Sequence, residues 1–182
     1  IKLPVSDISS VLKKIRKIAS YSRTEYIRDV VYGRKEDKKK IRLRILDNFE
    51  FQCLDATNKY RVSVEDGVKK EIEEIVYKGN CVDEARTMIS LQGDFVEENS
   101  YEKIRVLFAD KTSSEITLDI YPFGCWIEVE GKPEEIHRVA SGLGYSQGDY
   151  ITTSADDLYL EWHKKHNLPE MWDVRFGLSG KK

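Results

Sequence analysis

The sequence has none of the features of a membrane-spanning or disulfide-rich chain. No apolar run approaches the roughly 20 residues that a membrane-spanning helix needs, and no basic stretch followed by an apolar segment opens the chain. Cysteine is scarce, and the three residues Cys53, Cys81 and Cys125 form neither an even disulfide set nor a metal-ligand spacing. We therefore expect a cytoplasmic protein that has no membrane partner.

An excess of positive charge is also missing. The 30 lysines and arginines are outnumbered by 32 aspartates and glutamates, which gives a formal net charge of -2. This balance excludes a broadly basic surface, so we expect no nucleic-acid partner. Charged residues make up 34% of the 182 residues and hydrophobic residues 40%, with a mean hydropathy of -0.53. These values predict a single globular domain over residues 1–182.

What the sequence does have is charged residues at period two in three successive strand-length runs between residues 101 and 131. Because side chains alternate across a strand, each run has one apolar face and one charged face. The first run carries cations and the next two carry mainly carboxylates, a division that suits a polyphosphate and its metal ions. The residues at these positions are Lys103 and Arg105, then Thr117 and Asp119, then Glu128 and Glu130.

Hydrophobic spacing and cap residues predict the remaining elements. Apolar residues recur at helical spacing after Asp7, and Pro133 and Ser154 mark the starts of two later helices. Asp66-Gly67 predicts a hairpin turn. The expected helices cover residues 8–18, 83–91, 133–144 and 158–166, and the expected strands cover 1–5, 24–32, 40–46, 49–54, 60–64, 68–77 and three segments between 101 and 131.

Five short motifs follow one another along nearly the whole chain. Each two-residue motif is common by itself, so the specificity lies in their order and spacing. In that order and spacing the sequence resembles the CYTH, or triphosphate tunnel metalloenzyme, superfamily, and it is most similar to the bacterial and archaeal class IV adenylyl cyclase-like branch. The segments that carry the resemblance are 1–4, 41–44, 71–73, 101–105 and a closing set of Asp119, Phe123-Gly124, 128–131 and 143–145.

This resemblance implies an α+β fold, namely a closed antiparallel eight-stranded β-barrel whose charged faces line a tunnel, with helices packed on the outside. A tunnel excludes bulk water, so its charges interact with a triphosphate more strongly than they would on an open surface. The residues implied to be catalytic and to hold the phosphate oxygens are Lys2, Arg42, Arg44, Lys103 and Arg105, with Glu71 and Glu73 orienting them or a water molecule. The residues implied to bind Mg²⁺ or Mn²⁺ are Asp119, Glu128 and Glu130.

Three functions follow from the resemblance. The first hypothesis is a metal-dependent adenylyl cyclase of the class IV type, which converts the nucleoside triphosphate ATP to cyclic AMP and pyrophosphate. The second is a triphosphatase that releases phosphate from inorganic triphosphate or another linear triphosphate. The third is a non-catalytic polyphosphate or nucleotide binder. Relatives in the cyclase branch also point to a homodimer.

Several positions leave alternatives open. Without the family pattern, the charged faces would be ordinary solvent-facing sides of a sheet, and Glu71 and Glu73 could lie on an exposed hairpin edge within the charge cluster 69–74. Asp29 stands on a predicted strand and has no assigned role. The lysine that the family often has in the strand at 49–54 is missing, so Lys59 or Arg61 would replace it.

The opening motif is incomplete in this sequence. If Lys2 is the family's lysine, its two metal-binding glutamates would precede Ile1. We therefore expect a glutamate immediately before Ile1 and another two residues earlier, and the parent sequence would test this expectation.

Overall fold

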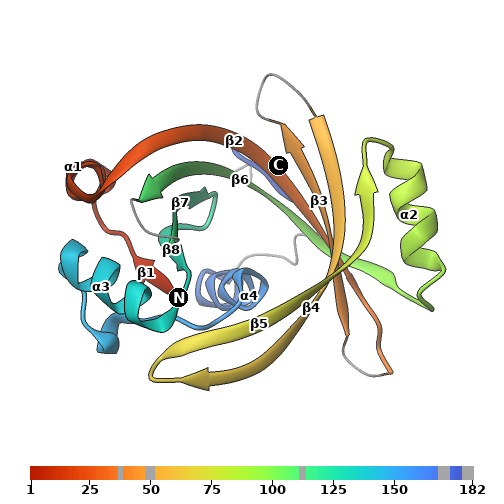
Figure 1. The fold of residues 1–182 in the computed structure, drawn as a ribbon. Coiled ribbons are helices and arrows are strands. Elements are labelled where there is room, and N and C mark those ends of the chain that lie inside the picture. The colour runs from red at the N-terminus through yellow and green to blue at the C-terminus, as the bar shows by residue number, and fades with distance from the viewer. Residues whose placement is uncertain (37–38, 48–51, 111–113, 168–172, 178–182) are drawn as a thin grey trace.

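The computed structural model describes residues 1–36, 39–47, 52–110, 114–167 and 173–177 and has the predicted α+β composition (Figure 1). The described strands are β1 (Lys2–Pro4), β2 (Ala19–Gly33), β3 (Lys40–Asp47), β4 (Gln52–Glu65), β5 (Val68–Gly79), β6 (Val96–Asp110), β7 (Glu115–Tyr121), β8 (Gly124–Glu130) and β9 (Asp173–Val174). The described α-helices are α1 (Ile8–Ile18), α2 (Val82–Ser90), α3 (Pro133–Leu143) and α4 (Ala155–Lys165). The strands form one sheet in the order β1-β8-β7-β6-β2-β3-β4-β5, and β9 pairs with β6 beside this path. Neighbouring strands are antiparallel except β6 and β9, which run parallel.

Most of the predicted elements are confirmed, and their ends follow the predicted caps. Asp7 starts α1 by accepting hydrogen bonds from the backbone N–H groups of Ser9 and Ser10 at 2.9 and 3.3 Å. Gly144 ends α3 in the left-handed conformation, with φ of 89°. None of the helices in the described ranges is long and apolar enough to cross a membrane.

The middle of the chain differs from the prediction. Residues 52–65 form the single strand β4, whereas the sequence predicts two strands at 49–54 and 60–64, of which 49–51 lie outside the described residues. The segment between them pairs with β3 on one side and β5 on the other, and this two-sided pairing keeps Asp55 and Asn58 in a strand despite their weak strand preference. The predicted turn at Asp66-Gly67 is confirmed, with φ of 50° and 75° at its two residues.

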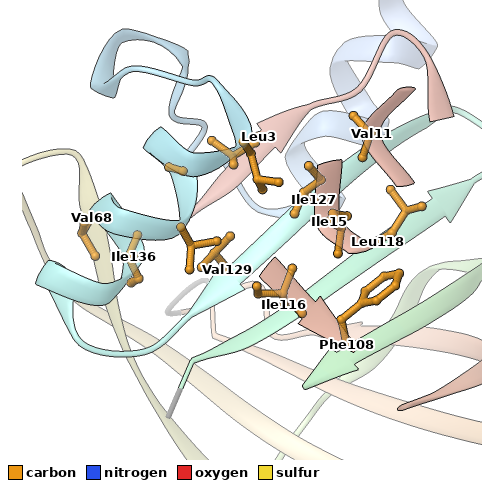
Figure 2. Packing of buried hydrophobic residues seen from close by; sticks show 14 residues of the cluster. Leu3, Val11, Ile15, Val68, Phe108, Ile116, Leu118, Ile127, Val129 and Ile136 are labelled. Atoms are coloured by element: carbon orange, nitrogen blue, oxygen red, sulfur yellow. The ribbon is translucent and has the colours of Figure 1, made fainter. Parts of the chain in front are cut away.

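Two apolar clusters cover the convex side of the sheet. Ile15 of α1 and Ile136 of α3 pack with Leu3 of β1 and with residues of β6, β7 and β8 (Figure 2). Ala85 and Ile89 of α2 pack in the same way on β3 and β4. Burial of these apolar faces is the main stabilising term for such a sheet, and strand alternation then turns the charged faces to the concave side.

The last helix lies on the other side of the sheet. Figure 1 shows α4 inside the curve formed by β2 and β6 on one side and by β4 and β5 on the other. The ring centroids of Tyr159 and Trp162 lie 5.4 and 6.2 Å from that of Phe123, and Tyr101 and Tyr121 belong to the same cluster. The prediction that helices pack on the outside therefore does not hold for α4, because aromatic residues replace charged ones at this end of the concave face.

The predicted closure of the sheet into a barrel is not confirmed. β1 and β5 are the two ends of the strand order, and no ladder joins them within the described ranges. The outer edge of the three-residue strand β1 is already taken, because Lys2 and Ile151 exchange backbone hydrogen bonds of 2.9 Å in both directions. Val68 at the start of β5 instead packs beside Ile136 of α3 (Figure 2). The region where β5 faces β1, β8 and Ile151 without a strand ladder is here called the seam.

Candidate active site

A cavity of about 840 Å³, here called the charged pocket, lies on the concave side of the sheet. Its lining comes from strands that are far apart in the sequence and from the start of α4. The predicted site residues that line it are Lys2, Arg42, Arg44, Glu71, Glu73, Lys103, Arg105, Glu128 and Glu130. Their side chains therefore converge on one cavity rather than on separate solvent-facing patches. Asp119 is the predicted site residue that does not line it.

Strand alternation places these side chains. On β3, Arg42 and Arg44 line the pocket, while Ile41 and Leu43 are 0% and 1% exposed and pack in the cluster beneath α2. The charged residues of β6 and β8 follow the same pattern against the cluster beneath α1 and α3. A one-residue change of register would exchange the two faces, so the buried apolar residues fix which charges point inward.

Asp29, whose role the sequence leaves open, holds Arg44 in place. The two residues stand opposite each other in the ladder of β2 and β3. Arg44 donates from Nε and Nη2 to the two carboxylate oxygens of Asp29 at 2.8 and 2.7 Å. Burial by itself would raise the pKa of Asp29, but the charge and hydrogen bonds of Arg44 hold that pKa well below its ordinary value. The guanidinium is thus oriented, and its Nη1 group lies outside these two contacts.

A buried network fixes the cations of β6. Arg105 donates from Nε and Nη2 to Asp119 at 2.7 and 2.6 Å, and its Nη2 also donates to Glu128 at 2.6 Å. Lys103 donates to Asp119 at 2.8 Å and to the Tyr121 hydroxyl at 3.3 Å. Asp119 therefore lies between two cations, and the network holds Arg105 and Lys103 at the wall of the pocket.

Burial and the crowding of cations set the protonation of this network. Burial and the charge of the adjacent Arg105 together lower the pKa of Lys103 to about 7, against the attraction of Asp119. Burial would raise the pKa values of Asp119 and Glu128, but the neighbouring cations hold both below their ordinary values. The two carboxylates are therefore ionised at neutral pH, whereas Lys103 is close to its titration point and is ready to gain a proton when an anion approaches.

On the side of the pocket formed by β3, β4 and β5, the charged side chains have fewer fixed hydrogen bonds. Glu73 is ion paired with Lys59, and Arg42 Nη2 lies 4.0 Å from Glu73 Oε1. Arg42 Nε is buried and has no hydrogen-bond partner in the part of the chain that the structure describes. Arg42 thus keeps donors that a phosphate oxygen could use. Lys59 lines this wall, as expected for the missing lysine, whereas the side chain of Arg61 lies outside the described residues.

Glu128 and Glu130 are the predicted metal-binding carboxylates that line the pocket. They stand two residues apart on β8, and partial burial together with the charge of Glu128 raises the pKa of Glu130. Mg²⁺ is usually held by one or two carboxylates together with substrate phosphates and water. Within the described ranges no three His, Cys, Asp or Glu side chains form a complete metal site. Asp119 is ion paired with Lys103 and Arg105, and Glu128 with Lys2 and Arg105. Metal binding by these carboxylates therefore stays a prediction.

The first turn of α4 closes one end of the pocket with carboxylates. Asp156 and Asp157 line this end, and Asp156 accepts a hydrogen bond of 2.8 Å from the Tyr101 hydroxyl. Lys40 Nζ lies 3.7 Å from Asp156, and burial raises the pKa of that carboxyl. Ser154 accepts a hydrogen bond from the Asp157 backbone N–H, so the helix N-terminus is already capped. These two carboxylates therefore repel a phosphate chain, whereas the lysines and arginines of the pocket attract it.

Sequence reasoning gave no role to several polar residues of the pocket, among them Asp29, Tyr101 and Asp156. Tyr101 is two residues before Lys103, so strand alternation could have placed it on the same face. Asp156 had no comparable signal, because its position depends on the docking of α4 against a patch of aromatic rings.

No family model and no curated protein matches the sequence. Solved structures do match the fold. PH1819 from Pyrococcus horikoshii OT3 superposes with a TM-score of 0.70 at 21% identity, over 88% of this chain and 98% of that chain. PH1012 from the same organism superposes with a TM-score of 0.68 at 18% identity, over 87% and 96% of the two chains. The chain has the fold of these proteins.

The same fold occurs in HpAC1 from Hippeastrum, with a TM-score of 0.61 at 14% identity over 88% of this chain and 94% of that chain. HpAC1 is named as an adenylyl cyclase and has a dominant triphosphatase activity. The chain thus shares its fold with a protein of the kind that the sequence resemblance implies. Identities this low support a shared architecture and leave the reaction to be argued from the site.

Proposed function

We propose that this protein is a metal-dependent enzyme that binds the triphosphate of a nucleoside triphosphate in the charged pocket. The observation that carries the proposal is the convergence of five predicted phosphate-binding cations on one cavity, beside Glu128 and Glu130. Chemistry on a phosphoryl group depends on positioning and charge neutralisation, so it needs no nucleophilic side chain. The pocket supplies both.

The cations have different tasks in this proposal. Arg44 and Arg105 are oriented by Asp29 and Asp119 and offer donors whose direction is fixed before the ligand arrives. Arg42 completes its hydrogen bonds on a phosphate oxygen. Lys103, with its pKa lowered to about 7, takes up a proton as the anionic ligand raises that pKa again.

Glu128 and Glu130 would hold Mg²⁺ or Mn²⁺ at the edge of this cationic group. A bound cation of this kind neutralises phosphate charge and polarises a phosphoryl oxygen. Glu128 accepts a hydrogen bond from Arg105 and lies 3.3 Å from Lys2, so the same carboxylate is tied to two of the phosphate-binding cations. This arrangement would keep the bound Mg²⁺ or Mn²⁺ close to the phosphates.

The reaction that we propose first is cyclisation of ATP. The ribose 3′-oxygen forms a bond to the α-phosphorus, the bond from that phosphorus to the oxygen bridging to the β-phosphate breaks, and pyrophosphate leaves. The proton of the 3′-hydroxyl passes to solvent or to a pocket carboxylate. The pocket cations would neutralise the charge that builds up on the leaving pyrophosphate. The sequence motifs and the shared fold support this reaction.

Hydrolysis of a triphosphate is the second candidate. The dominant triphosphatase activity of HpAC1, which has the same fold, favours it. Water would replace the ribose hydroxyl as the nucleophile, a bond would form from its oxygen to the terminal phosphorus, and the bond to the bridging oxygen would break. The water proton would leave to solvent, and orthophosphate would be released. The same cations would serve this reaction.

Product analysis separates these reactions. The protein would be incubated with ATP or with inorganic triphosphate, in Mg²⁺ or Mn²⁺, and the products separated by ion-exchange chromatography. Cyclic AMP with pyrophosphate is the result expected for cyclisation, and orthophosphate is expected for hydrolysis. Tight binding without turnover would identify a non-catalytic binder. Failure to bind either compound would overturn the proposal.

Two variants test the assigned residues. Arg44→Ala should lower turnover by about 100-fold, because one oriented donor to the phosphates is lost. Glu130→Gln should lower turnover with little change in the unfolding midpoint, since the substitution keeps the size of a residue that retains solvent-exposed surface. Arg16→Ala, at an exposed position on α1, is the matched control. Wild-type rates in both pocket variants would remove the assigned site.

A further inference from the structure

Thr117 of β7 carries a buried hydroxyl group that the contacts described so far do not explain. The residue is 2% exposed, and its Oγ1 atom has no hydrogen-bond partner among the residues that the structure describes. A buried hydroxyl without a partner costs free energy, because it has lost water and gained nothing in return. Valine has nearly the same shape and would fill this position without that cost. The hydroxyl at Thr117 therefore indicates a partner that binds from outside the chain or a neighbour that becomes available later.

The strand ladders show which side chains flank this hydroxyl. Thr117 stands opposite Leu107 of β6 on one side and opposite Glu128 of β8 on the other. Residues directly opposite each other in an antiparallel pair lie on the same face of the sheet, with their Cβ atoms about 5 Å apart. Leu107 can neither donate nor accept a hydrogen bond. Glu128 is therefore the polar side chain that faces the Thr117 hydroxyl across a ladder.

The carboxylate of Glu128 is held by two cations in the structure. Arg105 Nη2 donates to it at 2.6 Å, and Lys2 Nζ lies 3.3 Å from it. Because β7 lies between β6 and β8, the contact from Arg105 to Glu128 spans the strand of Thr117. The proposed function assigns both cations to the phosphates. Glu128 then needs another hydrogen-bond donor when a triphosphate is bound.

The other carboxylate near Thr117 is a poorer acceptor. Asp119 lies two residues further along β7 and on the same face. Its two oxygen atoms already accept from Arg105 at 2.7 and 2.6 Å, and Lys103 donates to one of them at 2.8 Å. The geometry thus favours Glu128 as the acceptor for the Thr117 hydroxyl.

We infer that Thr117 is a positioning residue of the predicted metal site, whose hydroxyl donates a hydrogen bond to Glu128 when this carboxylate binds Mg²⁺ or Mn²⁺. This inference rests on the proposed function and adds to it a residue that does not line the charged pocket. A threonine hydroxyl turns its hydrogen toward an acceptor without a change in the backbone. Carboxylates that bind metal ions are usually hydrogen bonded by such outer groups, which fix their direction.

Three variants test this role. Thr117→Val removes the hydroxyl and keeps the shape of the side chain, and Thr117→Ser restores the hydroxyl. Thr57→Val is the matched control, since Thr57 is 3% exposed and donates at 3.1 Å to Asp55, which is not a predicted metal ligand. The dissociation constant of Mn²⁺ would be measured from the electron paramagnetic resonance signal of the free ion. Urea unfolding in EDTA would be measured on the same proteins.

We expect Thr117→Val to weaken Mn²⁺ binding by about tenfold or more. Thr117→Ser and Thr57→Val should bind Mn²⁺ as the wild type does. In EDTA, the unfolding midpoint of Thr117→Val should be no lower than that of the wild type, because the hydroxyl that it loses has no partner among the described residues. A hydroxyl with a structural role would give the reverse result, namely a lower midpoint and an unchanged Mn²⁺ affinity.

Wild-type Mn²⁺ affinity in Thr117→Val would overturn the inference and leave the proposed function in place. An equal loss of affinity in Thr117→Ser would assign the effect to packing and would overturn the inference as well. Wild-type protein that binds inorganic triphosphate in EDTA but does not bind Mn²⁺ would overturn the inference together with the metal assignment of Glu128. Wild-type protein that binds neither would instead overturn the proposed function.

Discussion

The wall of the charged pocket built by β6 and β7 buries its charges, whereas the wall built by β4 and β5 leaves them partly in solvent. In the first wall, Lys103 and Asp119 are each 2% exposed and lie 2.8 Å apart. In the second wall, the side chains of Lys59 and Glu73 are 31% and 46% exposed. The nearest carboxylate oxygen to Arg42 Nη2 in that wall is 4.0 Å away, on Glu73.

Because of this difference, charged residues of the same kinds are rigid in one wall and adjustable in the other. Buried charges that are hydrogen bonded to each other cannot separate without a large desolvation cost, so the first wall presents donors in fixed directions. Exposed ion pairs contribute little free energy and change partners easily. The second wall, which borders the seam, is therefore able to adjust to the ligand.

The largest effect is expected from Arg105→Ala in the buried wall. The change removes two hydrogen bonds to Asp119 and one to Glu128, and we expect a stability loss of about 3–5 kcal/mol. Turnover should fall by about 1000-fold, because the oriented donor is lost as well. Urea unfolding and steady-state kinetics measure the two effects. An unchanged unfolding midpoint would show that the network does not stabilise the fold.

Asp29→Asn should have the next largest effect, because it disturbs the orientation of Arg44 while keeping the shape of the side chain. We expect kcat/KM to fall by about 100-fold. Glu102→Gln is the matched control, since Glu102 is a 7% exposed carboxylate that accepts a hydrogen bond from the Phe176 backbone N–H outside the pocket. Both variants should lose stability, but only Asp29→Asn should lose activity. Equal activity in the two would assign Asp29 a structural role alone.

The pH dependence of stability tests the burial of Lys103, whose pKa is lowered from 10.5 to about 7, mainly by burial. The unfolded chain binds more protons than the folded chain between these two values, so this group makes stability rise with pH across that window. Below about pH 7 both states are protonated, and the cost of the buried ammonium is fully present. Urea unfolding at several pH values above 7 should show the wild type gaining stability relative to Lys103→Met. Parallel curves for the two proteins would contradict the buried-wall assignment.

The smallest effect is expected from Lys59→Ala in the exposed wall. Its ion pair with Glu73 is partly in solvent, so stability should change by less than about 1 kcal/mol. The Michaelis constant for the triphosphate substrate should rise a few-fold, while kcat stays near the wild-type value. A loss of kcat as large as that of Arg105→Ala would mean that the two walls do not differ in function.

Local patterns in the sequence predicted the charged faces correctly. The alternation around Arg42, Arg44, Lys103 and Arg105 depends on neighbouring residues only, and the buried apolar partners confirm the inward direction. The caps at Asp7 and the turn at Asp66-Gly67 are equally local.

The features that the sequence did not predict depend on distant contacts. Whether the sheet closes depends on which residue pairs with the outer edge of β1. That residue is Ile151, which is far from β1 in the sequence. The role of Asp29 appears only when β3 is set in register beside β2. In the same way, Asp156 reaches the pocket only because α4 packs on the concave side.

The turn at Asp66-Gly67 determines more than the direction of the chain. Gly67 has φ of 75°, and a Cβ atom at this position would lie 3.2 Å from the ring of Tyr150, which follows α3. The bare backbone thus lets the hairpin tip settle against the neighbouring segment, with Val68 beside Ile136 (Figure 2). The close approach of the β4–β5 hairpin to the segment after α3 consequently depends on one residue that has no side chain.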